Sequence, residues 1–232
     1  MHVVALCSQK GGSGKTTLSG HLAVQAELAG HGPVALMDTD PQGSLAAWWN
    51  ERSSTAPVFA STTLAQLPGD IERLRLEGCR LVVIDTPPAI NMAIQRVINV
   101  ADLVIIPTRP SPHDLRAVAG TVEMVERAHG AMVFVVNAAN LRAKITADAV
   151  IALSQHGTVA PTFIQQRVDF ATAMIDGRTV CEIDPEGRSA SEIRLLWDYL
   201  AGQLERRDRL RVFQQPTILG FGRRTALEGA QA

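Results

Sequence analysis

Apolar residues in this chain fall into short, almost uninterrupted runs that alternate with longer stretches of mixed character. A short apolar run bounded by turn residues predicts a buried strand, whereas apolar residues at helical spacing predict a helix. The predicted strands are residues 3–7, 33–37, 58–60, 81–84, 103–107, 131–136 and 162–164. The predicted helices are residues 17–29, 43–52, 70–77, 91–100, 112–128, 145–155, 168–175 and a last helix that opens with a capping box at Ser189–Glu192.

Strands that alternate with helices in this way predict an α/β fold, with a doubly wound, mainly parallel sheet flanked by helices. The chain has 232 residues, which suffices for one domain with a full core. We expect this domain to span residues 1–205. Residues 206–232 combine Gly, Pro and Gln with clustered Arg, and we expect them to form a basic, flexible tail.

The turn between the first strand and the first helix is rich in glycine and lysine, with the sequence Lys-Gly-Gly-Ser-Gly-Lys-Thr-Thr at residues 10–17. Glycines let successive backbone N–H groups point inward, the helix offers its positive N-terminus, and a lysine adds a full charge, so this turn predicts a phosphate site. The spacing departs from the plain P-loop pattern, and Lys10 stands where that pattern requires no lysine. The candidate nucleotide-binding residues are Gly11, Gly12, Ser13, Gly14, Lys15, Thr16 and Thr17, of which Thr16 has the hydroxyl that usually meets Mg²⁺.

Carboxylates follow two further predicted strands. Asp38 and Asp40 come after residues 33–37, and Asp85 comes after residues 81–84. The carboxyl ends of parallel strands face the crevice where ligands bind. Alternate residues of a strand point the same way, so Asp38 and Asp40 are placed to address one Mg²⁺–water cluster; a solvated turn with an Asx cap is the alternative. Asp85 after a run of apolar residues is the Walker B pattern, which predicts a carboxylate that holds Mg²⁺ through water.

These three motifs together resemble the deviant Walker A ATPases of the ParA/MinD family, and the resemblance extends over residues 1 to about 200. It implies hydrolysis of ATP with Mg²⁺ by a homodimer that sandwiches two nucleotides. Within that dimer, Lys10 would reach the partner's nucleotide and Lys15 would hold the phosphates. Asp40 would position the attacking water, with Asp38 nearer the metal. Asn137, after the strand at 131–136, would contact adenine.

A proline-rich turn precedes the helix at 112–128. Ser111 is predicted as its N-cap, Pro112 as its first residue and Asp114 as its third. The family has a similar turn beside the nucleotide and the dimer interface. Capping alone is the other interpretation, and the two are compatible.

Arginines gather towards the C-terminus. Residues 203–224 contain six Arg against Glu205 and Asp208, a local excess of four positive charges. Such a patch suits DNA phosphates without reading bases, and the family implies non-specific DNA binding by the ATP-bound dimer. A solvated helix end is the alternative. The candidate DNA-binding residues are Arg167, Arg188, Arg194, Arg206, Arg207, Arg209 and Arg211.

Composition narrows the function classes. The net charge is −1, there is no apolar run of membrane-spanning length, and the three cysteines lie far apart. We therefore expect a cytoplasmic protein. The resemblance to the ParA/MinD family implies a nucleoid-associated ATPase, stimulated by a ParB-like or cargo-adaptor protein, that segregates a plasmid or chromosome. Positioning of a protein cargo, such as a carboxysome or a chemoreceptor cluster, is the alternative. A MinD-like membrane-cycling regulator is disfavoured, because Pro216 and glycines interrupt any amphipathic stripe in the tail.

Overall fold

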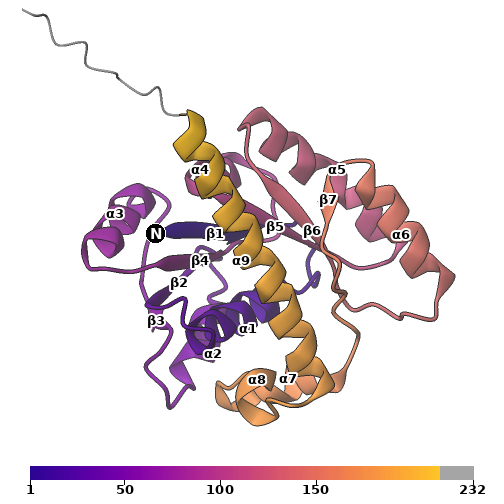
Figure 1. The fold of residues 1–232 in the computed structure, drawn as a ribbon, viewed down its shortest axis with the longest axis horizontal. Coiled ribbons are helices and arrows are strands. Elements are labelled where there is room, and N and C mark those ends of the chain that lie inside the picture. The colour runs from indigo at the N-terminus through magenta and orange to yellow at the C-terminus, as the bar shows by residue number, and fades with distance from the viewer. Residues whose placement is uncertain (215–232) are drawn as a thin grey trace, which may run out of the picture.

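The computed structural model describes residues 1–214, with side chains through residue 210. Its core is a seven-stranded sheet in the order β3-β2-β4-β1-β5-β6-β7, and every pairing is parallel (Figure 1). The α/β prediction is therefore confirmed. The strands are β1 (His2–Leu6), β2 (Val34–Asp38), β3 (Val58–Phe59), β4 (Leu81–Asp85), β5 (Leu103–Thr108), β6 (Met132–Val136) and β7 (Thr158–Val159).

Helices cover both faces of the sheet, so the strands are buried on both sides as their apolar runs predict. On one face α1, α2, α7, α8 and α9 pack over the sheet, and on the other α3, α4, α5 and α6. The helices are α1 (Lys15–Leu28), α2 (Ser44–Asn50), α3 (Leu67–Leu76), α4 (Met92–Val100), α5 (Pro112–Arg127), α6 (Lys144–Ser154), α7 (Val168–Ala173), the 3-10 turn η1 (Met174–Asp176), α8 (Val180–Ile183) and α9 (Arg188–Gln214).

The strand register brings the ligand-binding candidates to one edge of the sheet. Asp85 at the end of β4 lies opposite Asp38 on β2 and opposite Leu6 on β1. Residues 10–14 continue from that end of β1 into α1. The N-cap of α5 is also as predicted, because the Ser111 hydroxyl accepts a bond from the backbone N–H of Asp114 at 3.1 Å. The phosphate loop and the carboxylates therefore lie at the carboxyl edge of a parallel sheet.

Two predictions about the C-terminal third are wrong. The last strand is β7 at Thr158–Val159 and not residues 162–164. Pro161 interrupts the ladder because it has no N–H to donate, although Ile164 still donates its N–H to the Val136 carbonyl at 3.0 Å.

The capping box predicted at Ser189–Glu192 does not form, because α9 already begins at Arg188. Instead, the Ser189 hydroxyl donates to Asp169 at 2.8 Å, and Glu192 accepts bonds from Gln165 and Arg167. A capping box is present one helix earlier, at Thr179 and Glu182 of α8.

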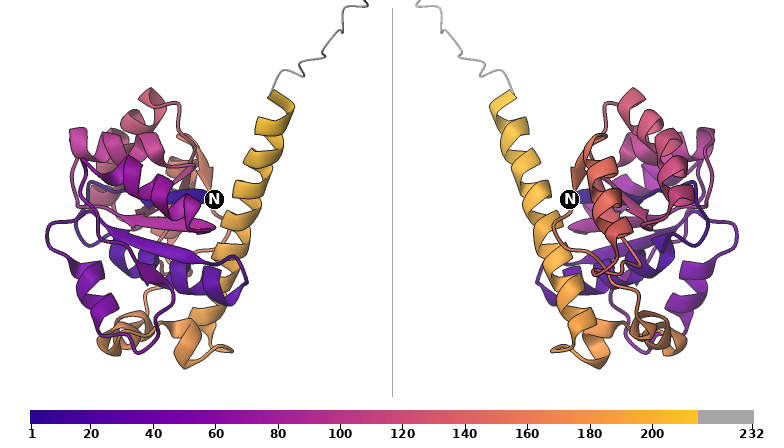
Figure 2. Two further views of the ribbon diagram at one scale, coloured as in Figure 1. Left: turned by 90° about the vertical axis from the view of Figure 1, so that its left-hand side faces the viewer. Right: turned by 90° about the vertical axis from the view of Figure 1, so that its right-hand side faces the viewer.

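The last helix is longer than its apolar spacing predicts. It continues to Gln214, so it includes the first part of the tail expected over residues 206–232, while residues 215–232 lie outside the described part of the chain. Figure 2 shows that its C-terminal end projects beyond the sheet and its helices. His2 and Asp208 approach to 3.2 Å where α9 passes the start of β1. No helix between residues 1 and 214 is long and apolar enough to cross a bilayer.

Candidate functional site

The loop between β1 and α1 has the backbone conformation of a phosphate cradle. Gly12 and Gly14 have φ values of 74° and 96°, which side-chain-bearing residues rarely adopt, and Gly14 is the N-cap of α1. A Cβ atom on Gly14 would also overlap the amide of Asn137. Gly12 is therefore required by its conformation and Gly14 by both conformation and space, and the loop leads directly into a helix N-terminus that favours anions.

Asn137 holds this loop from the end of β6, which is separated from β1 by β5. Its side-chain amide donates to the Ser13 carbonyl at 2.7 Å, and its backbone N–H donates to the Thr108 carbonyl at 2.9 Å. The side chain thus fixes the loop from the end of β6. Its contact with adenine stays a prediction.

Lys15 is the first residue of α1 and is buried, with 6% of its surface exposed. Burial lowers the pKa of its ammonium, while the charges of Asp85 and Asp40 raise it. The pocket in front of it is lined by Gly11, Gly12, Gly14, Lys15, Thr16, Thr17, Asp40, Pro88 and Arg109. A buried ammonium at the N-terminus of a helix, beside a glycine-rich loop, is a good site for a polyphosphate.

Asp85 is buried at the end of β4, and burial raises its carboxyl pKa to about 6. The Thr16 hydroxyl donates to Oδ2 at 2.6 Å and the Ser19 hydroxyl donates to Oδ1 at 3.2 Å. These oxygen atoms belong to the ligand types that Mg²⁺ prefers, and burial gives the carboxylate a cost that a cation would offset. The residues present therefore fit a magnesium ion.

Asp38 and Asp40 differ in their surroundings. The Asp38 carboxylate accepts backbone N–H groups from Asp40 at 2.9 Å, Leu45 at 3.0 Å and Ala46 at 3.1 Å, so it caps the start of α2. The Asp40 carboxylate accepts one such bond, from Gln42 at 2.9 Å, and lines the pocket. Asp40 is thus the less constrained of the two and the better placed to act on a ligand.

Lys10 is exposed and is not among the residues that line the pocket. Its backbone N–H donates to the Ser8 hydroxyl at 3.3 Å. A side chain that faces solvent here is available to a second copy of the chain. Its role across a dimer stays a prediction.

The predicted DNA-binding arginines lie in two groups. Near the start of α9, Arg167 pairs with Glu192 at 2.6 Å and Arg194 donates to the Pro185 carbonyl at 3.2 Å; Arg188 begins the helix. The others, Arg206, Arg207, Arg209 and Arg211, lie on the last turns of α9, and the Arg211 side chain is outside the described residues. At 1.5 Å per residue, about 18 Å of helix separates Arg194 from Arg206, so the two groups do not form one compact patch.

Sequence reasoning missed two residues of this site. Ser19 donates to Asp85 from the second turn of α1, and Arg109 reaches the pocket from the turn after β5. The position of Arg109, directly after a central strand, could have indicated that it lies at the ligand-binding edge of the sheet. Ser19 follows the loop by one helical turn, but only the fold shows that it faces β4.

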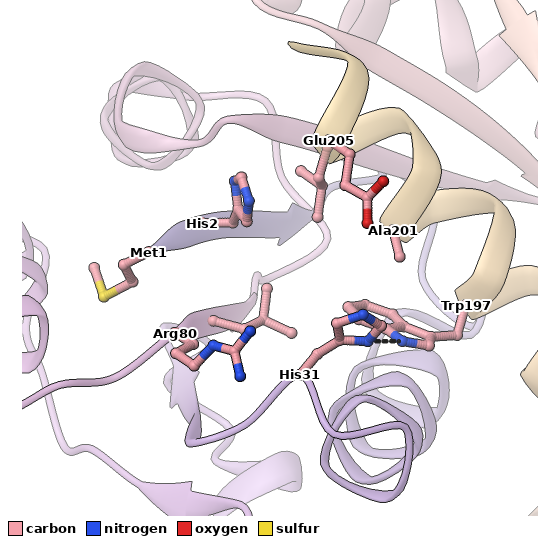
Figure 3. Close-up of a pocket in the computed structure, with 9 residues that line it drawn as sticks. Met1, His2, His31, Arg80, Trp197, Ala201 and Glu205 are labelled. Carbon is pink, nitrogen blue, oxygen red and sulfur yellow. Dashed lines mark hydrogen bonds between the residues drawn. The ribbon is translucent and has the colours of Figure 1, made fainter. Parts of the chain in front are cut away.

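A different cavity, of roughly 290 Å³, lies where α9 passes the beginnings of β1 and β4 (Figure 3). Its lining includes His31 and Trp197, and the indole N–H of Trp197 donates to Nδ1 of His31 at 2.9 Å. This is the amino edge of the sheet, opposite the glycine loop. The cavity is therefore separate from the phosphate site.

The fold and the glycine loop define a P-loop nucleotide-binding protein. The model of the CobQ/CobB/MinD/ParA nucleotide binding domain matches residues 4–180, and the chain belongs to that family. It is an ATPase of the ParA/MinD type.

Three comparisons illustrate the relationship. The maintenance of carboxysome distribution protein A of Halothiobacillus neapolitanus is 31% identical over 198 residues, which cover 82% of this chain and 91% of the relative. The chromosome-partitioning ATPase Soj of Thermus thermophilus is 26% identical over 241 residues, which cover 87% of this chain and 96% of the relative. In the MinC:MinD cell division protein complex of Aquifex aeolicus, one chain matches with a TM-score of 0.74 at 16% identity, covering 87% of this chain and 96% of that one.

Proposed function

We propose that this protein is an ATP-controlled positioning ATPase that binds non-specific DNA as a dimer and moves a protein cargo along the nucleoid. The observation that carries its nucleotide chemistry is the 2.6 Å contact between Thr16 and Asp85 beside a glycine loop. The cargo follows from the relative that is named for carboxysome distribution and aligns over 91% of its length.

In this proposal each residue of the site has one task. Lys15 and the loop amides hold the phosphates, Thr16 and Asp85 hold Mg²⁺, and Asp40 orients the water that attacks the terminal phosphate. A bound Mg²⁺ would neutralise phosphate charge. Lys10 of a second copy adds positive charge where negative charge develops in the transition state. The nucleotide thereby sets how long the dimer stays on DNA.

Segregation of a plasmid or chromosome is the second candidate. It is favoured by the alignment with Soj, which covers 87% of this chain but at a lower identity, 26%. Both functions use the same ATPase, and an adaptor protein that stimulates hydrolysis selects the cargo. The comparisons therefore support the protein-cargo alternative better than the segregation that the sequence alone put first.

The DNA surface is proposed on the end of α9, where Arg206 and Arg209 are exposed. We expect the combined replacement of Arg206, Arg207, Arg209 and Arg211 by Ala to weaken DNA binding and to flatten its dependence on salt. Replacing Arg73 and Arg75 of α3 by Ala is the matched control. If the salt dependence of DNA binding is unchanged, the DNA-binding surface lies elsewhere on the protein.

The cargo is tested by deleting the gene in its source organism and measuring two properties of the same cells. One is the spacing of labelled carboxysome shells, and the other is the rate of plasmid loss. Clustered shells with normal plasmid retention would support a protein cargo. Evenly spaced shells with increased plasmid loss would establish segregation instead.

A further inference from the structure

Arg109 occupies a fixed position at the carboxyl edge of the sheet. It directly follows β5, whose last residue, Thr108, pairs with Val136 of β6. On its other side, the Ser111 N–H donates to the Arg109 carbonyl at 2.8 Å, and Ser111 caps α5. The backbone that carries this arginine is therefore held by a strand and by a capped helix.

The Arg109 guanidinium lies over the phosphate loop. Its Nη2 atom is 3.7 Å, and its Cζ atom 4.0 Å, from the place that a Cβ atom on Gly12 would occupy. It lines the same pocket as Lys15, Thr16 and Asp40. These distances are ordinary van der Waals separations, so Gly12 is required by its φ of 74° and not by the arginine.

Within the described residues, the Arg109 guanidinium makes no hydrogen bond or ion pair. Arg109 is exposed, whereas the more buried Arg52 and Arg167 are paired with Glu182 and Glu192. A guanidinium stays charged at any accessible pH, and its planar fork of donors matches the oxygens of a phosphate. An unpaired guanidinium in a phosphate pocket is thus complementary to an anionic ligand.

The position along the loop indicates which phosphate it meets. The backbone N–H groups at the start of α1, after Gly14, are the place for the inner phosphates. Arg109 instead approaches Gly12, earlier in the loop, and shares the pocket with Asp40, to which the proposed function gives the attacking water. The last phosphate of ATP is the one that lies towards that water.

We infer that Arg109 contacts the terminal phosphate of ATP bound in its own chain and so distinguishes ATP from ADP. This inference rests on the proposed function, since it takes the P-loop pocket as the ATP site. It adds a second cation beside Lys15, one that senses the phosphate lost on hydrolysis.

The test is the affinity of the protein for a non-hydrolysable ATP analogue and for ADP, both with Mg²⁺, measured by calorimetry. Arg109→Ala should weaken binding of the analogue by roughly 10-fold or more, the range of one charge-assisted hydrogen bond, and change ADP affinity less than twofold. Arg109→Lys should restore part of the loss, because it keeps the charge without the fork. Arg75→Ala, on exposed α3, should change neither affinity.

Equal effects on both nucleotides, or none, would overturn the inference, provided that the variants unfold at the wild-type temperature. Arg109→Lys supplies the answer should the alanine variant prove unstable. Lys15→Ala separates this failure from that of the proposed function. If Lys15→Ala abolishes binding while Arg109→Ala leaves the ratio of ATP to ADP affinity unchanged, the ATP site stands and only the role of Arg109 is lost.

Discussion

The Thr16 hydroxyl donates a 2.6 Å hydrogen bond to Oδ2 of Asp85, across 69 residues of sequence. It joins the first turn of α1 to the end of β4. The parallel pairing of β1 with β4 makes this contact possible, because it places Leu6, before the glycine loop, opposite Asp85. The motif that binds phosphate and the carboxylate that suits Mg²⁺ are thus brought together by the sheet.

Asp85 should make the metal-free protein less stable above pH 6. Burial raises its pKa from 3.8 to about 6, so the folded state binds more protons than the unfolded state between these values, and stability falls as the pH rises through that window. We expect Asp85→Asn to raise the free energy of unfolding by roughly 1–2 kcal/mol at pH 8. This gain should shrink as the pH falls towards 4.

Urea unfolding with a chelator present, at pH 5 and pH 8, measures this difference. Asp102→Asn is a useful comparison, since Asp102 is a half-buried carboxylate elsewhere that accepts the Val3 N–H at 2.8 Å. A variant that is less stable than wild type at pH 8 would contradict the account of Asp85.

Replacing either of the two loop lysines, Lys10 or Lys15, should impair the protein in a different way. Lys15 is buried against the pocket, so Lys15→Ala should abolish detectable ATP binding. Lys10 is exposed and outside the pocket lining, so Lys10→Ala should bind ATP with near-normal affinity but hydrolyse it at least tenfold more slowly. Lys144→Ala is the control. Parallel nucleotide titrations and phosphate release check this, and unchanged binding in Lys15→Ala would remove the proposed phosphate site.

Asp40 should be needed for turnover and dispensable for binding. Its carboxylate lines the pocket and accepts one backbone bond, so Asp40→Ala should bind ATP and accumulate as a dimer, with hydrolysis reduced roughly 100-fold or more. Light scattering with ATP and single-turnover hydrolysis provide the readouts. Normal turnover in this variant would assign the water to another residue.

Arg52 should contribute strongly to the stability of the fold. Only 2% of its side chain is exposed; it pairs with Glu182 at 2.8 Å and donates to the Gly177 carbonyl at 2.6 Å. Arg52→Ala leaves the partly buried Glu182 carboxylate without its cation and should cost about 3 kcal/mol. Arg178→Ala, which breaks an exposed pair with Asp176, should leave the urea midpoint nearly unchanged. Equal effects of the two substitutions would contradict the assignment.

Much of this fold was predictable because its signals are local. The apolar runs of β1, β2, β4, β5 and β6, and the carboxylates that end β2 and β4, can be read from neighbouring residues. Ser189 and Glu192 were misread as a helix cap for the same reason. Their partners are Asp169, Gln165 and Arg167, which come from earlier in the chain and outcompete a local motif.

The remainder of the site depends on the sheet order. Arg109 meets Gly12 because β5 pairs with β1, and Asn137 meets Ser13 because β6 lies next to β5. No known sequence pattern predicts either contact, because the two residues of each pair lie far apart in the sequence. The phosphate loop was thus predictable from its residues, whereas the side chains that hold or approach it from other strands were not.

The central claim is that the state of the nucleotide controls association with DNA. The most direct measurement is a mobility-shift assay on random-sequence DNA with Mg²⁺ and ATP, with ADP, or without nucleotide, using wild type and Lys15→Ala. We expect a shift only for wild type with ATP. Equal binding in all conditions, or none in any, would contradict it and make a membrane or a protein scaffold the next surface to test.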